Sequence, residues 1–260
     1  MFGQKMVTPA IPERVYTLCR IVRSSNNHYI SDKDLRERME PDFLGNNSSY
    51  YHDYLTAATE LRLVQVVDGM VSLIAEPRTV DSMNSLRKHC NGILREFSGG
   101  QFFEVTRAYF NLGANVLAGP NNVAEWGGRF KDEAELTVNA MELRAWRFWF
   151  TYLGFGYLHD MFLLPSAGIF IRDVIDIAGM EKRRRYSFGE FIDLIRPYAD
   201  VVLGEESGTL NFGFSNGLRS LHDSGVVTLE HILDQEDIWS LYPMQLHSID
   251  ATVTNITLNR

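Results

Sequence analysis

The stretch "LVQVVDGMVSLI", Leu63 to Ile74, decides the fold of the N-terminal part of the chain. Two runs rich in β-branched residues flank Asp68 and Gly69, and an Asp-Gly pair between such runs is a strong signal for a two-residue β-hairpin. The residues before this hairpin carry three helical patterns. Because three helices followed by a hairpin are the elements of a winged helix-turn-helix, the sequence predicts this fold for the first unit.

Each of the three helices has a recognisable beginning. Pro12 suits the first turn of a helix, Ser31 stands at a capping position before "DKDLRERME", and the segment "GNNSS", residues 45–49, supplies a third cap. We expect the first helix to end at "SSNNHY", the second before Pro41 and the third just before the hairpin.

The C-terminal end repeats this pattern. Ser187 and Glu190 have capping-box spacing at the start of "FGEFIDLIRPYADVVL", a helix that we expect to bend at Pro197. Residues 209–223 form a further helix. The strand "GVVTL" follows, and "TVTNITL" is its partner after a long excursion from about residue 230 to 250. These elements predict a second winged helix with an enlarged wing loop.

The middle of the chain contains "ELRAWRFWFTYLGFGYL", in which seven aromatic rings lie between Trp146 and Tyr157. Helical periodicity divides this stretch into two faces. The face predicted to point inward consists of Leu143, Trp146, Trp149, Phe150 and Leu153. Gly154 ends the helix, "FGYL" and "MFLL" pair as a hairpin, and we expect Pro165 to begin another helix. We interpret this segment as a third, degenerate winged unit.

The predicted fold class is therefore mainly α-helical with short β-hairpin wings, an α+β chain of tandem winged helix-turn-helix units. Two units are clear in the sequence, and the middle one is a candidate third. The predicted domains are an N-terminal winged helix over residues 1–80, a central helical domain with a short hairpin over 81–180, and a C-terminal winged helix over 181–260.

The composition restricts the partners and the compartment. The chain has 260 residues, a net charge of −8 and a pI of about 5.4, so nucleic acid repels it at long range and any DNA contact needs a local basic patch or a basic partner. Its two cysteines form no disulfide framework, which is typical of a cytoplasmic protein. The sequence has neither an apolar signal core nor about 20 consecutive apolar residues, so we expect no membrane contact.

The third helix of a winged unit usually enters the major groove, so its outward residues are candidate contacts. In the first unit, Ser48 and Ser49 at the helix start could donate to a phosphate. His52 follows on the same face, beside Asp53 and Glu60. Because this face has two carboxylates and no arginine, a solvated or protein-docked surface is favoured over a DNA-binding one.

In the last unit, the residues predicted to face outward are Asn211, Phe212, Ser215, Arg219 and His222, and the first four are the candidate contacts. Asparagine and arginine side chains can contact base edges, whereas an outward phenylalanine suggests a protein partner. Both alternatives stay open from the sequence.

Two further candidate surfaces are basic. Arg144, Arg147 and Thr151 form a stripe on the outer side of the aromatic helix. The arginines either contact phosphates or snorkel over aromatic faces by cation–π contact, and the second alternative is slightly favoured. The densest positive run consists of Lys182, Arg183, Arg184 and Arg185. It belongs to the segment from Glu181 to Arg185, which we interpret as a linker, and it is also the best single candidate for a phosphate contact.

Motifs for catalysis are absent from the sequence. It contains no Gly-rich phosphate loop, and His89-Cys90 has no second Cys/His pair at zinc-site spacing. The cluster between His222 and Asp237 resembles an acidic wing loop more than a metal site. We therefore expect no catalytic residues, no cofactor and no metal, with an enzyme that uses this cluster as the alternative.

The segment "LRAWRFWFTYLGFGYLHDMFLLPSAGIFIRDVI", residues 143–175, resembles the central part of the DpdG family, a component of bacterial 7-deazaguanine DNA modification–restriction clusters. That family has an aromatic-rich helix, an "LGFGW"-like turn, a short strand and a Pro-started helix, and here Tyr157 replaces the tryptophan. The terminal "FSNGLRSLHDSGVVTLEHIL" and "TVTNITL" and the N-terminal "VVDGMVSL" unit are also similar to it. The resemblance covers most of the chain, and its motifs contain no catalytic residues.

This resemblance implies a role rather than a reaction, because DpdG-like proteins are encoded beside helicases and nucleases that restrict unmodified foreign DNA. We therefore expect a non-catalytic adaptor of a DNA restriction or phage-defence complex, which binds a helicase or nuclease and, within that complex, DNA. Two alternatives stay open: a winged-helix partner of an SMC-type ATPase, and a homodimeric winged-helix transcriptional regulator.

Overall fold

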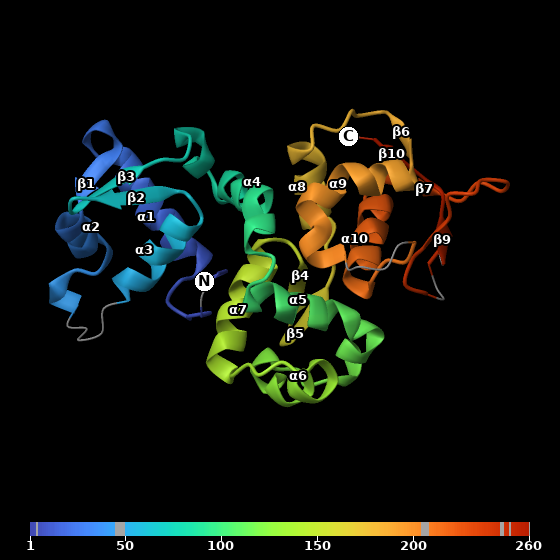
Figure 1. Cartoon of the computed structure of the whole chain (residues 1–260), viewed down its shortest axis with the longest axis horizontal. Coiled ribbons are helices and arrows are strands. Elements are labelled where there is room, and N and C mark those ends of the chain that lie inside the picture. The colour runs from blue at the N-terminus through green and yellow to red at the C-terminus, as the bar shows by residue number, and fades with distance from the viewer. Residues whose placement is uncertain (4, 45–49, 204–207, 245–246, 250, 260) are drawn as a thin grey trace.

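The computed structural model describes residues 1–3, 5–44, 50–203, 208–244, 247–249 and 251–259. The chain is a mixed α+β protein, mainly helical with small antiparallel sheets (Figure 1). This confirms the predicted fold class at that level. Among the described residues, no helix combines the length and the apolar character needed to cross a membrane.

The N-terminal unit is built in the order helix, strand, helix, helix, strand, strand. Its elements are α1 (Pro12–Ser24), β1 (Tyr29–Ser31), α2 (Asp32–Met39), α3 (Tyr51–Glu60), β2 (Val64–Val67) and β3 (Met70–Leu73). β3 lies between β1 and β2 and pairs antiparallel with both. The predicted hairpin is confirmed, and its turn residues Asp68 and Gly69 have φ angles of 49° and 74°, in the left-handed region that such a turn requires.

The predicted helix beginnings agree with the structure where it describes them. Pro12 is the first residue of α1. The Ser31 side chain accepts a hydrogen bond of 3.0 Å from the N–H of Asp34, which satisfies one of the unpaired donors in the first turn of α2. The predicted "GNNSS" cap lies outside the described residues, and α3 begins at Tyr51.

The middle of the chain is helical up to a terminal hairpin. Its elements are α4 (Met83–Ile93), α5 (Gln101–Asn111), α6 (Gly127–Ala134), α7 (Ala140–Tyr152), β4 (Gly156–His159) and β5 (Phe162–Pro165). The whole predicted inner face of α7 is fully buried. The rings of Trp146 and Phe150 lie 5.3 and 5.8 Å from the ring of Tyr109 on α5. The inward rings of the aromatic stretch are therefore core, because they pack against one another, whereas Phe148 and Tyr157 are exposed.

The hairpin of β4 and β5 follows α7 directly, as predicted. Gly154 ends the helix with a φ of 85°. Gly156 has no room for a side chain, since a Cβ there would lie 2.3 Å from the carbonyl oxygen of Leu164. Within the described part of the chain, no third strand joins this two-stranded sheet. The middle segment thus shares a helix and a hairpin with the N-terminal unit, but not a third paired strand.

The prediction that Pro165 begins a helix is wrong. Pro165 is the last residue of β5 and stands opposite Gly156 of β4, and the next helix begins at Gly168. A proline is tolerated at this place because the end of an edge strand needs no further backbone donor.

The C-terminal unit has the same order of elements as the N-terminal unit. It consists of α8 (Gly168–Ile177), β6 (Arg185–Ser187), α9 (Phe188–Leu203), α10 (Phe212–Asp223), β7 (Val227–Glu230) and β10 (Asn255–Leu258). Here too the last strand, β10, lies between the other two. Two short strands, β8 (Trp239–Ser240) and β9 (Thr252–Val253), pair with each other between β7 and β10.

α8 belongs with the helices that follow it. It packs against α10 so closely that a Cβ added to Gly217 would lie 2.5 Å from the backbone nitrogen of Gly168. The predicted boundary between residues 180 and 181 therefore falls between α8 and the elements on which it packs.

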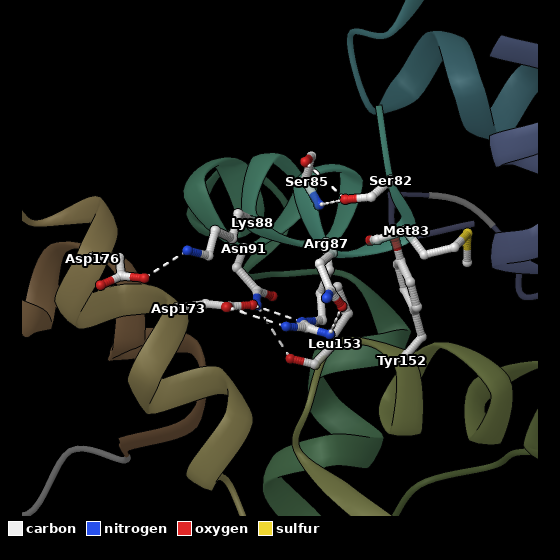
Figure 2. A network of polar contacts seen from close by, with 11 residues as sticks. Ser82, Met83, Ser85, Arg87, Lys88, Asn91, Tyr152, Leu153, Asp173 and Asp176 are labelled. Carbon is white, nitrogen blue, oxygen red and sulfur yellow. Dashed lines mark hydrogen bonds and ion pairs between the residues drawn. The ribbon is translucent and has the colours of Figure 1, made fainter. Parts of the chain in front are cut away.

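A buried polar junction joins α4 to α8 and to the end of α7 (Figure 2). The guanidinium of Arg87 on α4 donates to both carboxylate oxygens of Asp173 on α8, over 2.7 and 3.3 Å. Asn91 on α4 donates to Asp173 at 3.0 Å and to the carbonyl oxygen of Leu153 at 3.2 Å. Because Asp173 is only 2% exposed, these donors replace the water that would otherwise stabilise its charge.

Arg87→Leu is expected to lower the free energy of unfolding by about 3–5 kcal/mol, because it leaves the buried carboxylate of Asp173 without its cation. Urea denaturation followed by tryptophan fluorescence measures this loss. Lys88→Leu is the matched control: Lys88 pairs with Asp176 at 2.5 Å, but both side chains are exposed, so its removal should cost less than about 1 kcal/mol. Equal losses in the two variants would contradict the importance of the buried junction.

Candidate partner-docking and nucleic-acid interfaces

Residues 231–254 connect β7 to β10, and we call this connection the excursion. It folds back over the side of α10 that the sequence predicts to face outward. The guanidinium of Arg219 donates to the carbonyl oxygens of Tyr242 and Ile249, over 2.8 Å in each case. The Ser215 hydroxyl accepts a hydrogen bond of 2.9 Å from the N–H of Tyr242. The side chains of Arg219 and Ser215 are thus occupied by hydrogen bonds to the excursion. In a helix that binds DNA, such outward polar side chains would be free to contact the DNA.

The prediction that Phe212, Ser215 and Arg219 point outward is therefore wrong. All three are buried, and the ring of Phe212 lies 5.0 Å from the ring of Tyr242. Asn211 caps α10, because its Oδ1 accepts a hydrogen bond of 2.9 Å from an N–H in the first turn. Helical periodicity finds the polar side of a helix, but it does not show that a distant segment covers that side.

The corresponding helix of the N-terminal unit, α3, borders an open groove. This groove has a volume of about 570 Å³ and runs between α3 and the β2–β3 hairpin; we call it the α3 groove. It is lined by Asp32, His52, Leu55, Thr56, Thr59, Glu60, Val66 and Gly69. The predicted contact residue His52 is exposed here. Ser48 and Ser49 lie outside the described residues.

The α3 groove has no lysine or arginine side chain in its described lining that would attract a phosphate. Its described lining contains two carboxylates and neither lysine nor arginine. The carboxylate of Glu60 accepts hydrogen bonds from the N–H groups of Phe2 and Gly3, over 3.1 and 2.6 Å, and pairs with the terminal ammonium of Met1 at 2.6 Å. The ammonium of Met1 balances the charge of Glu60, but the carboxylate of Asp32 remains in the lining. The approach of a negatively charged DNA backbone therefore costs electrostatic energy.

The strand beside the groove, β2, is an apolar edge. β2 pairs only with β3 among the described strands, and its residues Val66 and Val67 are 45% and 54% exposed. Natural edge strands are usually protected by charges, prolines or bulges, but "VQVV" contains none of these residue types. An unprotected edge next to a groove is a surface on which a protein partner can pack or add a strand.

The basic stripe on α7 divides into two parts. Arg147 is half-buried and lies 5.2 Å above the ring of Phe148, which supports the cation–π alternative for this residue. The Thr151 hydroxyl donates to the carbonyl oxygen of Arg147 at 3.0 Å. Arg144 is exposed, and the described residues offer it only the sulfur of Met141, at 3.4 Å. Arg144 alone is therefore available to an anionic partner.

The predicted linker from Glu181 to Arg185 runs into β6, which begins at Arg185. Arg185 contacts Glu230 at 3.4 Å, and Arg184 contacts Glu190 at 2.7 Å. Arg184 also lies over the ring of Tyr186. All four cations of the run are exposed, but the last two have carboxylate partners within the C-terminal unit.

Two cysteines and one aspartate of types that can act in catalysis are buried or hydrogen-bonded here. Cys19 and Cys90 are buried; burial raises the pKa of Cys19 to about 12 and raises that of Cys90 as well, so neither is a thiolate at neutral pH. Asp237 accepts hydrogen bonds from the backbone N–H of Gly189 and the indole of Trp239, over 2.8 and 3.0 Å. In the part of the chain that the structure describes, no three His, Cys, Asp or Glu side chains are grouped so as to hold a metal ion.

Comparisons with protein-family models, with curated proteins and with solved structures find no match to this chain. The role of these surfaces therefore has to be inferred from their own geometry and charge.

Val66 and the edge of β2 were not predicted as part of a candidate site, because the sequence analysis considered only the outward residues of the helix before them. The signal was present in "VQVV", where valines stand on both sides of the strand instead of alternating with polar residues. Such a pattern is typical of a strand covered on both faces, yet the structure leaves this one exposed.

Arg219→Met is expected to loosen the excursion, because methionine keeps an apolar side chain but donates no hydrogen bond to the two carbonyl oxygens. Hydrogen bonds from a charged donor contribute about 1.5–3 kcal/mol each, so amide exchange in residues 241–244 and 247–249 should accelerate about tenfold or more. Hydrogen exchange read by mass spectrometry measures this change. Arg196→Met on α9, which removes an exposed contact of 3.8 Å with Asp200, is the control; unchanged exchange in Arg219→Met would contradict the assignment.

Proposed function

We propose that this chain is a non-catalytic adaptor subunit of a DNA restriction or phage-defence complex, and that it binds a helicase or nuclease partner at the α3 groove. One observation carries the proposal: the described lining combines an apolar floor with carboxylates and contains no lysine or arginine, and an apolar edge strand borders it. The restriction context comes from the sequence resemblance to the DpdG family.

We propose that the chain is built from winged-helix units in tandem. The order helix, strand, helix, helix, strand, strand occurs twice, and in both sheets the last strand is central. This repeated topology supports a winged helix at each end of the chain. The hairpin that follows α7 supports a degenerate third unit between them.

The partner surface at the α3 groove has a definable chemistry. Leu55 and Val66 offer apolar area to a side chain of the partner, and Asp32 offers a carboxylate to a lysine or arginine. Such a surface suits a partner segment that carries both apolar and basic residues. A DNA backbone is negatively charged and therefore needs cations on the protein surface that it contacts.

Base reading by these units is physically disfavoured. α10 is covered by the excursion, and α3 presents carboxylates where the phosphates of DNA would approach. DNA contact within the complex is therefore assigned in this proposal to cations outside these helices, such as Arg144 and Lys182.

The isolated chain is expected to bind duplex DNA only weakly and without sequence preference at physiological salt, with a Kd of about 10⁻⁴–10⁻⁶ M or weaker. A gel shift with unrelated duplex sequences at this salt concentration measures it. A tight shift that selects one sequence would overturn the adaptor proposal and favour the homodimeric regulator.

Val66→Arg is expected to reduce copurification with the helicase or nuclease subunit about tenfold or more, because a charged, bulky side chain in the centre of an interface costs about 2 kcal/mol. The measurement is a pull-down through a tag on the helicase or nuclease, after coexpression from the same defence gene cluster. Gln65→Arg is the matched control, since Gln65 is the neighbouring exposed residue and points to the other face of β2. Retained binding by Val66→Arg, or equal loss in both variants, would argue against docking at the groove.

A further inference from the structure

We infer that the C-terminal unit contains a phosphate-binding site between α8 and the turn that leads into β6. A small hollow of about 100 Å³ lies there. It is lined by Arg172, Ile175, Asp176, Lys182, Val226, Val227 and Leu258. Two cations from separate segments, Arg172 on α8 and Lys182 in the turn, thus border one concave space.

The carboxylate in the lining, Asp176, and the nearby carboxylate of Glu181 each have a cation partner. Asp176 pairs with Lys88 of α4 at 2.5 Å, a contact drawn in Figure 2. Glu181 lies 3.8 Å from Arg184, which also pairs with Glu190 at 2.7 Å.

Two cations that line the hollow, and a third next to one of them in the chain, have no carboxylate partner. Arg172, Lys182 and Arg183 are exposed, and within the described residues their side chains make no ion pair and no hydrogen bond. In a chain with a net charge of −8, two cations without an ion-pair partner at one hollow attract an anion from solution.

The turn that carries Lys182 is fixed in place by the sheet. The N–H of Arg183 donates to the carbonyl oxygen of Leu258 at 2.5 Å, and the N–H of Leu258 donates to the carbonyl oxygen of Arg184 at 3.1 Å. Arg183 adopts a φ of 60°, which is unfavourable for a residue with a side chain. These bonds hold the backbone of the turn against β10, so Lys182 stays beside the floor formed by Leu258 and Val227.

A phosphate group is the ligand that matches this arrangement. Its oxygens accept hydrogen bonds from the planar donors of an arginine and from the ammonium of a lysine together. A single carboxylate would leave most of the positive charge uncompensated. The phosphate can belong to a nucleic-acid backbone or to a small phosphorylated molecule, and both present the same oxygens.

The basic run of residues 182–185 has two parts with different surroundings. Arg184 and Arg185 are engaged with Glu190 and Glu230, whereas Lys182 and Arg183 join Arg172, which no local sequence pattern indicates. This site lies in a different unit from the α3 groove, so the loss of one does not entail the loss of the other.

The test compares two double variants that remove the same charge. Arg172→Gln/Lys182→Gln removes the cations of the hollow, and Arg184→Gln/Arg185→Gln removes the two paired arginines of the same run. The probes are a fluorescently labelled DNA duplex, titrated by anisotropy at several NaCl concentrations, and pyrophosphate, titrated by calorimetry. Thermal unfolding of both variants shows whether each is folded.

The wild-type chain is expected to bind the duplex with an affinity that falls as salt rises. Each lost phosphate contact reduces the slope of log K against log salt by about 0.9, so the Arg172→Gln/Lys182→Gln variant should lose about 2 units of slope and the control variant none. Binding of pyrophosphate but not of DNA, with the same dependence on the variants, would support the site and identify a small phosphorylated molecule as its ligand. The inference is overturned if the wild-type chain binds neither probe, or if the two variants lose binding equally.

Discussion

The buried carboxylate of Asp173 is the constraint on which the arrangement of the chain depends. A carboxylate that is 2% exposed has no water to stabilise its charge, so α8 must keep Arg87 and Asn91 of α4 against it. Asn91 extends the junction to the end of α7 through the carbonyl oxygen of Leu153. Because α8 also packs on α10, this junction positions the C-terminal unit against the helical middle of the chain, and α4 contacts α1 on its other side.

The two terminal units share one order of elements and offer opposite surfaces. In the N-terminal unit, the last two strands are joined by Asp68 and Gly69 alone, and the groove between this hairpin and α3 stays open. In the C-terminal unit, the same connection is the excursion of residues 231–254, and it covers α10 with hydrogen bonds to Arg219. The length of one connection thus separates an open groove with an acidic lining from a helix whose Ser215 and Arg219 side is covered, and the turn before β6 carries exposed cations of the C-terminal unit.

Local sequence patterns predicted the elements well wherever the signal lies within a few residues. The Asp-Gly turn, the cap at Ser31 and the buried aromatic face of α7 are all present. β1 and β6 were not predicted, because strands of three residues are too short to show an alternating pattern. The prediction at Pro165 failed for a related reason: proline is compatible both with the first turn of a helix and with the end of an edge strand, and only the pairing with Gly156 distinguishes them.

The amino-acid sequence by itself determined the helices, the two tight hairpins and the apolar faces, because periodicity and turn conformation act between residues that are close in the chain. Only the tertiary structure decided which polar residues are available to a partner. Arg219 is covered because Ile249, thirty residues further on, folds back onto it, and Arg185 is neutralised by Glu230 from another strand. Burial and ion pairing are properties of segments that meet in space, so the accessible surface could not be deduced from local patterns.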